Sequence, residues 1–460
     1  MNVTSIISAI GNNSSVYPLI VRDCGIEVPT KIYMTYNQNK EESKDIAYLA
    51  ARERFLDEYS TSAVWLGGIP LIGKLCDFVI KKKGLNPNVN LKLFKEEKFQ
   101  GIDYNIEKFK NIAPDAVKDL IKAKENKKLY EKLLAGKFIA STSIPILFMG
   151  FILPKLVFAS SAKKIEKMRG EAAKNVEGRK FGGQAVKPDN EISLSEIPQE
   201  QQTDNSYSSS PLFFYSSISS IPPALRLSFT SNWLSKTANF SVQDKMAVTD
   251  GGYAVGRVTT ARNKNESIDL AFKMTGMMFL NFVAPKWIEK ALNKLTGVTL
   301  DPVMLADKDF IEQIKNDALK LPKSGAERDL FEFIDNPANK TSVFVQYANK
   351  FGKLKMLDNG IRDPREYVDT KKLAQFREDI EKFAQKLKNS KDVKKFIRNA
   401  KISKTANILT NVGLSSFLLA YVLPKCQFAF RKFVTGSDLE PGLAPAGTNF
   451  SPIILKHFYI

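Results

Sequence analysis

The chain almost lacks histidine and has few cysteines: His457 stands alone among 460 residues, beside three cysteines. Zinc sites of the usual kinds, histidine-based acid–base pairs and Ser-His or Cys-His catalytic pairs depend on these side chains. Their scarcity nearly excludes such enzymes, although a carboxylate-based or lysine-based enzyme stays open. We therefore favour a non-catalytic protein and expect neither a metal nor a nucleotide as cofactor.

The cysteines Cys24, Cys76 and Cys426 are far apart, and no two form a CxxC pair. Cys76 and Cys426 lie in apolar segments, which predicts buried free thiols. Free thiols favour a reducing compartment. The first residues, MNVTSIISAIGNNSSV, lack the basic start and the long apolar run of a signal peptide, so none is expected.

A phosphate-binding glycine loop is also missing. The richest glycine stretch, GGYAVGR at residues 251–257, has neither the GxxxxGK[ST] nor the GxGxxG spacing. A turn leading into a strand or helix is the favoured interpretation. The weaker alternative is a nucleotide site. A separate, weaker hypothesis is an anion site in which Arg257 and Arg262, together with Asp250, provide the contacts.

What the chain has in excess is positive charge. Its 68 lysines and arginines against 49 aspartates and glutamates give a formal net charge of +19. Such a charge favours anionic partners, either an anionic membrane surface or nucleic acid. The alternative is that the lysines are spread over solvated helix faces.

One short pattern recurs along the chain. GFILPK (150–155), NFVAPK (281–286) and AYVLPK (420–425) each close an apolar stretch and open a basic one, and GGIPLIGK (67–74) is a looser copy. Recurrence of this kind indicates a duplicated structural unit in which proline ends or bends one helix and begins the next. The expected junction residues are Pro70, Pro154, Lys155, Pro285, Lys286, Pro424 and Lys425.

Four apolar segments, 62–80, 138–159, 268–285 and 406–430, form two pairs separated by charged sequence. This arrangement predicts two pseudo-repeated helical halves, residues 17–187 and 224–436. Between them, residues 188–223 are acidic, rich in Ser and Pro, and free of Lys and Arg, which is typical of a flexible linker. Residues 437–460 are expected to be a loose C-terminal tail, and the N-terminal end is expected to be loose as well.

The charged stretches have helical periodicity, so a mainly α-helical fold is predicted. Apolar residues recur at steps of three and four between Leu373 and Leu387, and a second, short helix is expected from Asp392. Residues 21–28 and 253–260 are expected to be short strands. The stripe consists of Leu373, Phe376, Ile380, Phe383 and Leu387.

Segment length bears on a membrane role, because a spanning helix needs roughly 20 mostly apolar residues. Segments 138–159 and 406–430 approach this length, whereas 62–80 and 268–285 carry charges and are expected to be buried or interfacial. The basic helices after Pro285 and Pro424, which end before Gly297 and Gly436, suit a membrane interface. They suit a soluble helical core equally well.

The sequence thus favours a non-catalytic, helical, membrane-associated protein that is interfacial or partly inserted and faces a reducing, cytoplasmic compartment. The alternative is a soluble basic scaffold that binds nucleic acid or an acidic protein.

Overall fold

The computed structural model describes residues 3–11, 20–41, 44–96, 98–180, 242–436 and 439–443. This part of the chain is mainly α-helical, as predicted, and its β-pairing is an isolated bridge between Met356 and Arg362. The predicted linker at 188–223 lies outside the described residues.

The two predicted strands are wrong. Residues 21–28 lie in the π-helical segment η1 (Ile20–Glu27) and the start of α3 (Val28–Asn39), and residues 253–260 continue α12 (Val242–Thr259). The glycines of α12 serve helix packing instead of a turn. A Cβ built on Gly256 would lie 2.7 Å from the Cα of Gly150, so only glycine allows this approach. Small residues four apart are typical of such close helix crossings.

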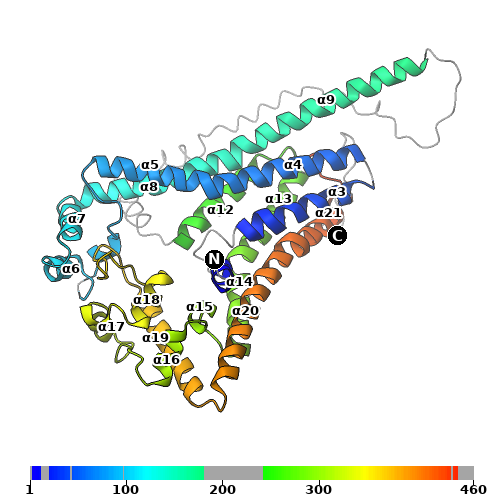
Figure 1. Ribbon diagram of the computed structural model, residues 1–460. Helices are drawn as coiled ribbons and strands as arrows, with labels where there is room; N and C mark the ends of the chain where they lie inside the picture. The colour runs from blue at the N-terminus through cyan, green and yellow to red at the C-terminus, as the bar shows by residue number, and fades with distance from the viewer. Residues whose placement is uncertain are drawn as a thin grey trace, which may run out of the picture.

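The first pair of long helices forms a structure that we call arm one, seen across the top of Figure 1. One helix runs through α4 (Lys44–Ala63), η2 (Val64–Gly68) and α5 (Ile69–Lys82). Its partner runs through α8 (Lys127–Leu147), η4 (Phe148–Ile152) and α9 (Leu153–Lys180). The chain therefore leaves along the first helix and returns along the second.

Arm two has the same out-and-back course. It consists of α13 (Lys264–Phe282) and α14 (Ala284–Thr296), followed after an insertion by α20 (Val393–Phe417), η7 (Leu418–Val422) and α21 (Leu423–Thr435). The short helix expected from Asp392 is instead the start of this long one, with Asp392 as its N-cap. The C-caps expected at Gly297 and Gly436 are present, both in the left-handed conformation.

Three prolines lie just after a π-helical turn. The residues before Pro70, Pro154 and Pro424 each donate a backbone hydrogen bond to the carbonyl five residues earlier. Proline lacks an N–H and clashes with the preceding turn, so a widened turn lets the helix continue through it. Pro285 differs, because it stands in the first turn of α14 after α13 has ended.

The insertions of both arms fold together into a unit that we call the bridging lobe, residues 83–126 and 297–392. Its largest core is built by the second insertion, and all five residues of the predicted stripe are buried in it. The lobe contains η3 (Leu91–Phe94), α6 (Ile102–Phe109), α7 (Pro114–Glu125), α15 (Pro302–Leu305), α16 (Lys308–Lys315), α17 (Glu327–Ile334), η6 (Pro337–Asn339), α18 (Val343–Lys350) and α19 (Thr370–Lys388).

Arg362 joins the two insertions inside the lobe. Its guanidinium is fully buried, donates to both oxygens of Asp335 and to the Asn105 side chain, and lies 5.0 Å from the ring centres of both Phe109 and Phe331. Residues from both predicted halves thus share one core.

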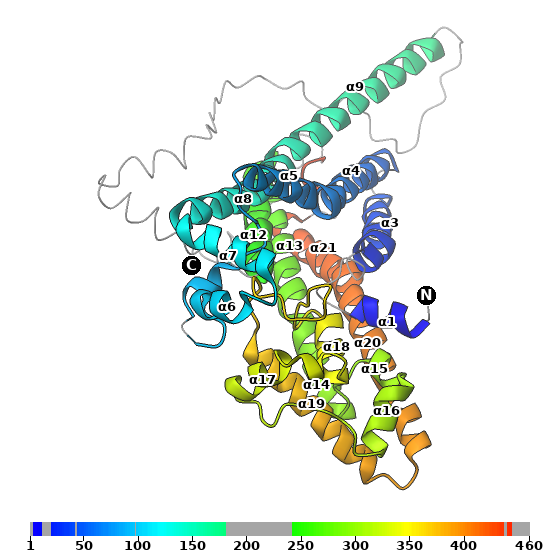
Figure 2. The same cartoon turned by 60° about the vertical axis from the view of Figure 1, so that its left-hand side comes forward.

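The arms diverge from a common vertex where α3, α4, α13 and α21 meet, and the bridging lobe spans the open side (Figures 1 and 2). The parts of the chain ends that the structure describes also pack onto this frame. Helix α1 (Val3–Gly11) lies against α20, and Leu439 and Leu443 are buried. The expectation of loose ends therefore does not hold for residues 3–11 and 439–443.

Candidate functional site

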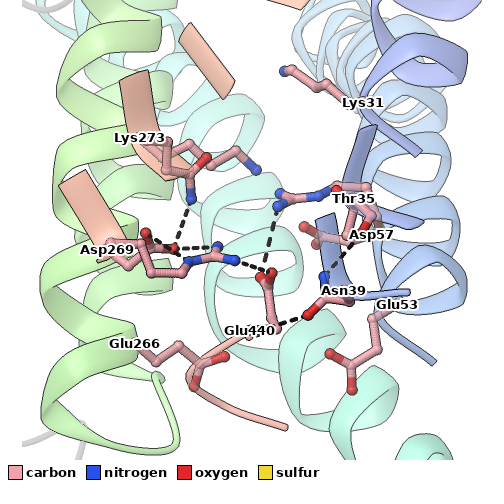
Figure 3. A network of polar contacts seen from close by, with 12 residues as sticks. Lys31, Thr35, Asn39, Glu53, Asp57, Glu266, Asp269, Lys273 and Glu440 are labelled. Carbon is pink, nitrogen blue, oxygen red and sulfur yellow. Dashed lines mark hydrogen bonds and ion pairs between the residues drawn. The ribbon is translucent and has the colours of Figure 1, made fainter. Parts of the chain in front are cut away.

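The vertex holds a network of buried ion pairs (Figure 3). From α4, Glu58 accepts a hydrogen bond of 2.9 Å from Lys273 of α13 and lies 3.5 Å from Arg54. A buried charge is tolerated only when it is paired in this way. The network therefore ties α4 to α13.

A second group of pairs connects α13, α21 and the end of the described chain. Arg431 is fully buried and donates 2.9 Å to Asp269, and its other Nη lies 2.9 Å from Glu440. The backbone N–H of Glu440 donates to Asn39 of α3. Residues 439–443 thereby join the network, and Glu440 also lies 3.7 Å from Arg54 of α4.

Arg257 and Arg262, the possible anion contacts, both lie in this region. Arg257 is buried and donates 2.9 Å to Asp57. Arg262 donates to Glu53 at 3.1 Å and to Glu266 at 2.9 Å. An external anion would have to displace these carboxylates.

Burial alone would lower the pKa of Lys31, but Glu27 and Glu58 outweigh burial and raise it. Burial lowers the pKa of Lys273 to about 8, and nearby Arg54 adds to the effect. Burial would raise the pKa of Glu440, yet Arg431 and Arg54 bring it to about 2. These shifts describe a set of mutually compensated charges.

The space inside the network is small. The cavity lined by Lys31, Arg54, Lys273 and Gln427 has a volume of about 10 Å³, roughly one water molecule. Among the described residues, no group of three or more His, Cys, Asp and Glu side chains is placed to hold a metal ion. The arrangement suits fixing helices rather than binding a ligand.

Asp250 of α12 is a buried carboxyl outside the paired network. Burial, together with the charge of Asp23, raises its pKa to about 7, whereas Arg22 opposes the shift. An unfolded aspartate titrates near about 4. Between these values the folded chain holds a proton that the unfolded chain releases, so this group lowers stability as the pH rises.

We expect Asp250→Asn to flatten the pH profile of stability. From about pH 4 to about pH 7 the wild type should lose on the order of 2–4 kcal/mol relative to the variant. Thermal melts across this range measure the difference, with Asp358→Asn, an exposed turn residue, as the control. Parallel profiles for wild type and Asp250→Asn would contradict the assignment.

The second notable feature is an outward apolar face on α20, η7 and α21. Residues 405–424 contain no charged side chain. The exposed positions from Ile402 to Tyr421 span about 29 Å at 1.5 Å per residue. The large exposed residues are Ile402, Leu409, Leu414, Phe417 and Tyr421, which are 41–59% exposed.

Basic residues flank this face at both ends. Lys394, Lys395 and Arg398 are exposed before it, and Lys425 is exposed after it. Cys426 is also exposed, so the prediction of a buried thiol is wrong there because this position lies on the outer face of α21. The sequence pattern could not separate the outer from the inner side of an apolar helix.

Arm one has comparable exposed positions. Leu71, Leu75 and Phe78 on α5 are 57–59% exposed, and Leu147 on α8 is 54% exposed. Lys74 interrupts the α5 face. A soluble helix normally buries such residues.

Three helices are long and apolar enough to cross a membrane: Lys44–Lys82, Lys127–Ile165 and Val393–Thr435. The expectation that segment 62–80 is too charged to qualify is wrong, because its helix continues through Pro70 and its most apolar stretch carries no more than two charged side chains. Only 6% of that window is buried, so it is not a core helix either.

The predicted junction residues fall into two environments. Pro154 and Pro424 are buried, and Pro70 is exposed on the outer side of arm one. Lys155, Lys286 and Lys425 are all exposed. The ion-pair partners Glu58, Asp269, Arg431 and Glu440 were not singled out from the sequence, because nothing local distinguishes them from solvated charges.

Comparison with known proteins gives no relative for this chain: no family model, no curated protein and no solved structure matches it.

Proposed function

We propose that this protein is a non-catalytic, membrane-associated helical protein, interfacial or partly inserted, whose arms contact an anionic leaflet on the reducing, cytoplasmic side. The observation that carries the proposal is the exposed face of α20, η7 and α21. A stretch of about 29 Å without charge offers a continuous apolar surface to the acyl chains of a bilayer. Exposure of so many large apolar side chains to water would be unfavourable.

Several features support the same reading. The flanking lysines and arginines would meet lipid phosphates, and three free cysteines suit a reducing compartment. The polar bridging lobe has its own core and can remain in water. The ion pairs of the vertex hold the two arms together where they meet, and no ligand is needed for this.

We also propose that the arms derive from a duplicated unit. In support, each arm runs out to the bridging lobe and back, and Pro70, Pro154 and Pro424 follow equivalent π-helical turns. Pro285 is the member without such a turn.

Phe417→Asp should release the protein from anionic vesicles while leaving it folded. Phe417 is 51% exposed, so a charge there meets lipid but disturbs little of the protein core. The cost of the charge is roughly 2.5–3.5 kcal/mol at the centre of a bilayer and less near the headgroups. Vesicle flotation and a thermal melt of the same sample measure both properties. Leu147→Asp tests arm one in the same way.

Leu419→Asp, two residues away, is the matched control. Leu419 is fully buried, so a charge there should unfold the protein with or without lipid. If Phe417→Asp instead unfolds the protein as Leu419→Asp does, the face packs against protein. A wild type that stays soluble and does not float would favour the soluble basic scaffold that binds nucleic acid or an acidic protein.

A further inference from the structure

Helix α14 presents an unusual distribution of side chains. Trp287, Ala291 and Leu295 recur every four residues and are all exposed, Trp287 by 64% and Leu295 by 81%. Phe279 of α13, itself 48% exposed, packs edge-on against Trp287 with ring centres 5.8 Å apart. An outward apolar row therefore follows the helix.

The inner side of α14 makes hydrogen bonds to α20. Lys404 of α20 donates 2.8 Å to Asn293, and Asn407 donates 2.8 Å to Thr296. Both Lys404 and Asn407 are buried. The helix is thus hydrogen-bonded to α20 on its inner side and exposes an apolar row that a helix on a water-soluble protein normally buries.

Lysines follow the apolar row at the preceding position in each turn. Lys286, Lys290 and Lys294 are exposed, and Glu289 is the one acidic residue of α14. Lysine stems of this kind lie along apolar surface and place their ammonium groups at the level of lipid phosphates.

The position of these lysines bears on the orientation of arm two. The hydrogen bonds from Lys404 and Asn407 place α14 beside the first half of the apolar face of α20. If α20 crossed the bilayer, the lysines of α14 would lie level with hydrocarbon, where charges are costly. If the arm lies along the surface, the same lysines reach the headgroups.

We infer that α14 and α20–α21 form one lipid-contact surface that lies in the plane of an anionic leaflet, with Trp287 and Leu295 inserted and Lys290 and Lys294 contacting lipid phosphates. This inference rests on the proposed membrane association and specifies its orientation and lipid class. The occupant is a lipid leaflet because the apolar row is bordered by lysines along its length, which matches the boundary between acyl chains and anionic headgroups.

The first test reverses charge on α14. Lys290→Glu with Lys294→Glu should weaken binding to phosphatidylglycerol vesicles about tenfold or more, because each lysine near an anionic surface contributes roughly 1 kcal/mol. The matched control is Lys308→Glu with Lys315→Glu, two exposed lysines of α16 with the same change in net charge. Equal weakening by both pairs, or none by the α14 pair, would overturn the inference.

The second test reads the orientation directly. With Cys24 and Cys76 replaced by serine, native Cys426 reports the far end of the arm and Lys391→Cys reports the start of α20. Both positions are exposed. In protein bound to the outside of sealed vesicles, an impermeant maleimide should label both. If only one of the two cysteines is labelled before detergent is added, arm two crosses the bilayer and the inference is overturned.

The third test is the fluorescence of Trp287, with Trp65 and Trp233 replaced by phenylalanine. Lipids brominated near the start of the acyl chain should quench it more strongly than lipids brominated at the chain end. Absence of quenching in vesicle-bound protein would contradict lipid contact at α14. A wild type that does not bind vesicles at all would instead remove the proposed function itself.

Discussion

Replacing Arg362 with alanine is expected to lower the free energy of unfolding by roughly 2–5 kcal/mol, because the buried carboxylate of Asp335 loses its bidentate partner and keeps only Lys108. The ring contacts with Phe109 and Phe331 are lost as well. Urea unfolding followed by circular dichroism measures the change. Arg362→Lys should also destabilise, since an ammonium cannot form the two parallel bonds.

Two controls make this result specific. Arg328→Ala removes an exposed ion pair on α17 and should leave the unfolding curve unchanged. Combining Arg362→Met with Asp335→Asn should recover part of the loss, because the buried carboxylate is gone and Lys108, its other partner, is partly exposed to water. If Arg362→Ala is as stable as the wild type, the two insertions do not depend on this contact.

The second large effect is expected at the vertex. Arg431→Met leaves Asp269 buried without its guanidinium and leaves Glu440 with Arg54 alone, and should destabilise by roughly 3–5 kcal/mol. Residues 439–443 should detach, because the ion pair of Glu440 with Arg431 helps to hold them. Limited proteolysis of this segment and a thermal melt provide the two readouts.

Lys425→Met, an exposed change on the same helix, should affect neither readout. Adding Asp269→Asn to Arg431→Met should relieve part of the destabilisation by removing the carboxylate that has lost its cation. A protease-resistant, fully stable Arg431→Met protein would show that the vertex is held by apolar packing alone.

The elements that the sequence predicts well are those governed by local rules. The stripe from Leu373 to Leu387 predicted α19 and its buried face, and Gly297 and Gly436 predicted two helix ends. Helical periodicity and left-handed glycine caps depend on a few neighbouring residues, so they can be predicted from the sequence alone.

The predictions fail where a residue's role depends on contacts with residues far away in the sequence. Gly252 and Gly256 suggested a turn, but they allow α12 to cross close to Gly150, more than 100 residues away. The ion network joins residues from five segments, and no spacing in the sequence relates Glu58 to Lys273 or Arg431 to Asp269. Grouping by motif placed Pro285 with Pro154 and Pro424, whereas the backbone places Pro70 with them.

The closure of the vertex by Glu440 has a consequence for the order of folding. The bond from its backbone to Asn39 joins residues 401 positions apart, and Arg431 meets Asp269 across 162 positions. During synthesis, the charges on α3, α4 and α13 leave the ribosome long before their last partners do. Contacts this remote form slowly, because a long loop must close before they contribute. The charges on α3, α4 and α13 therefore lack these partners until residues 431–440 have been synthesised.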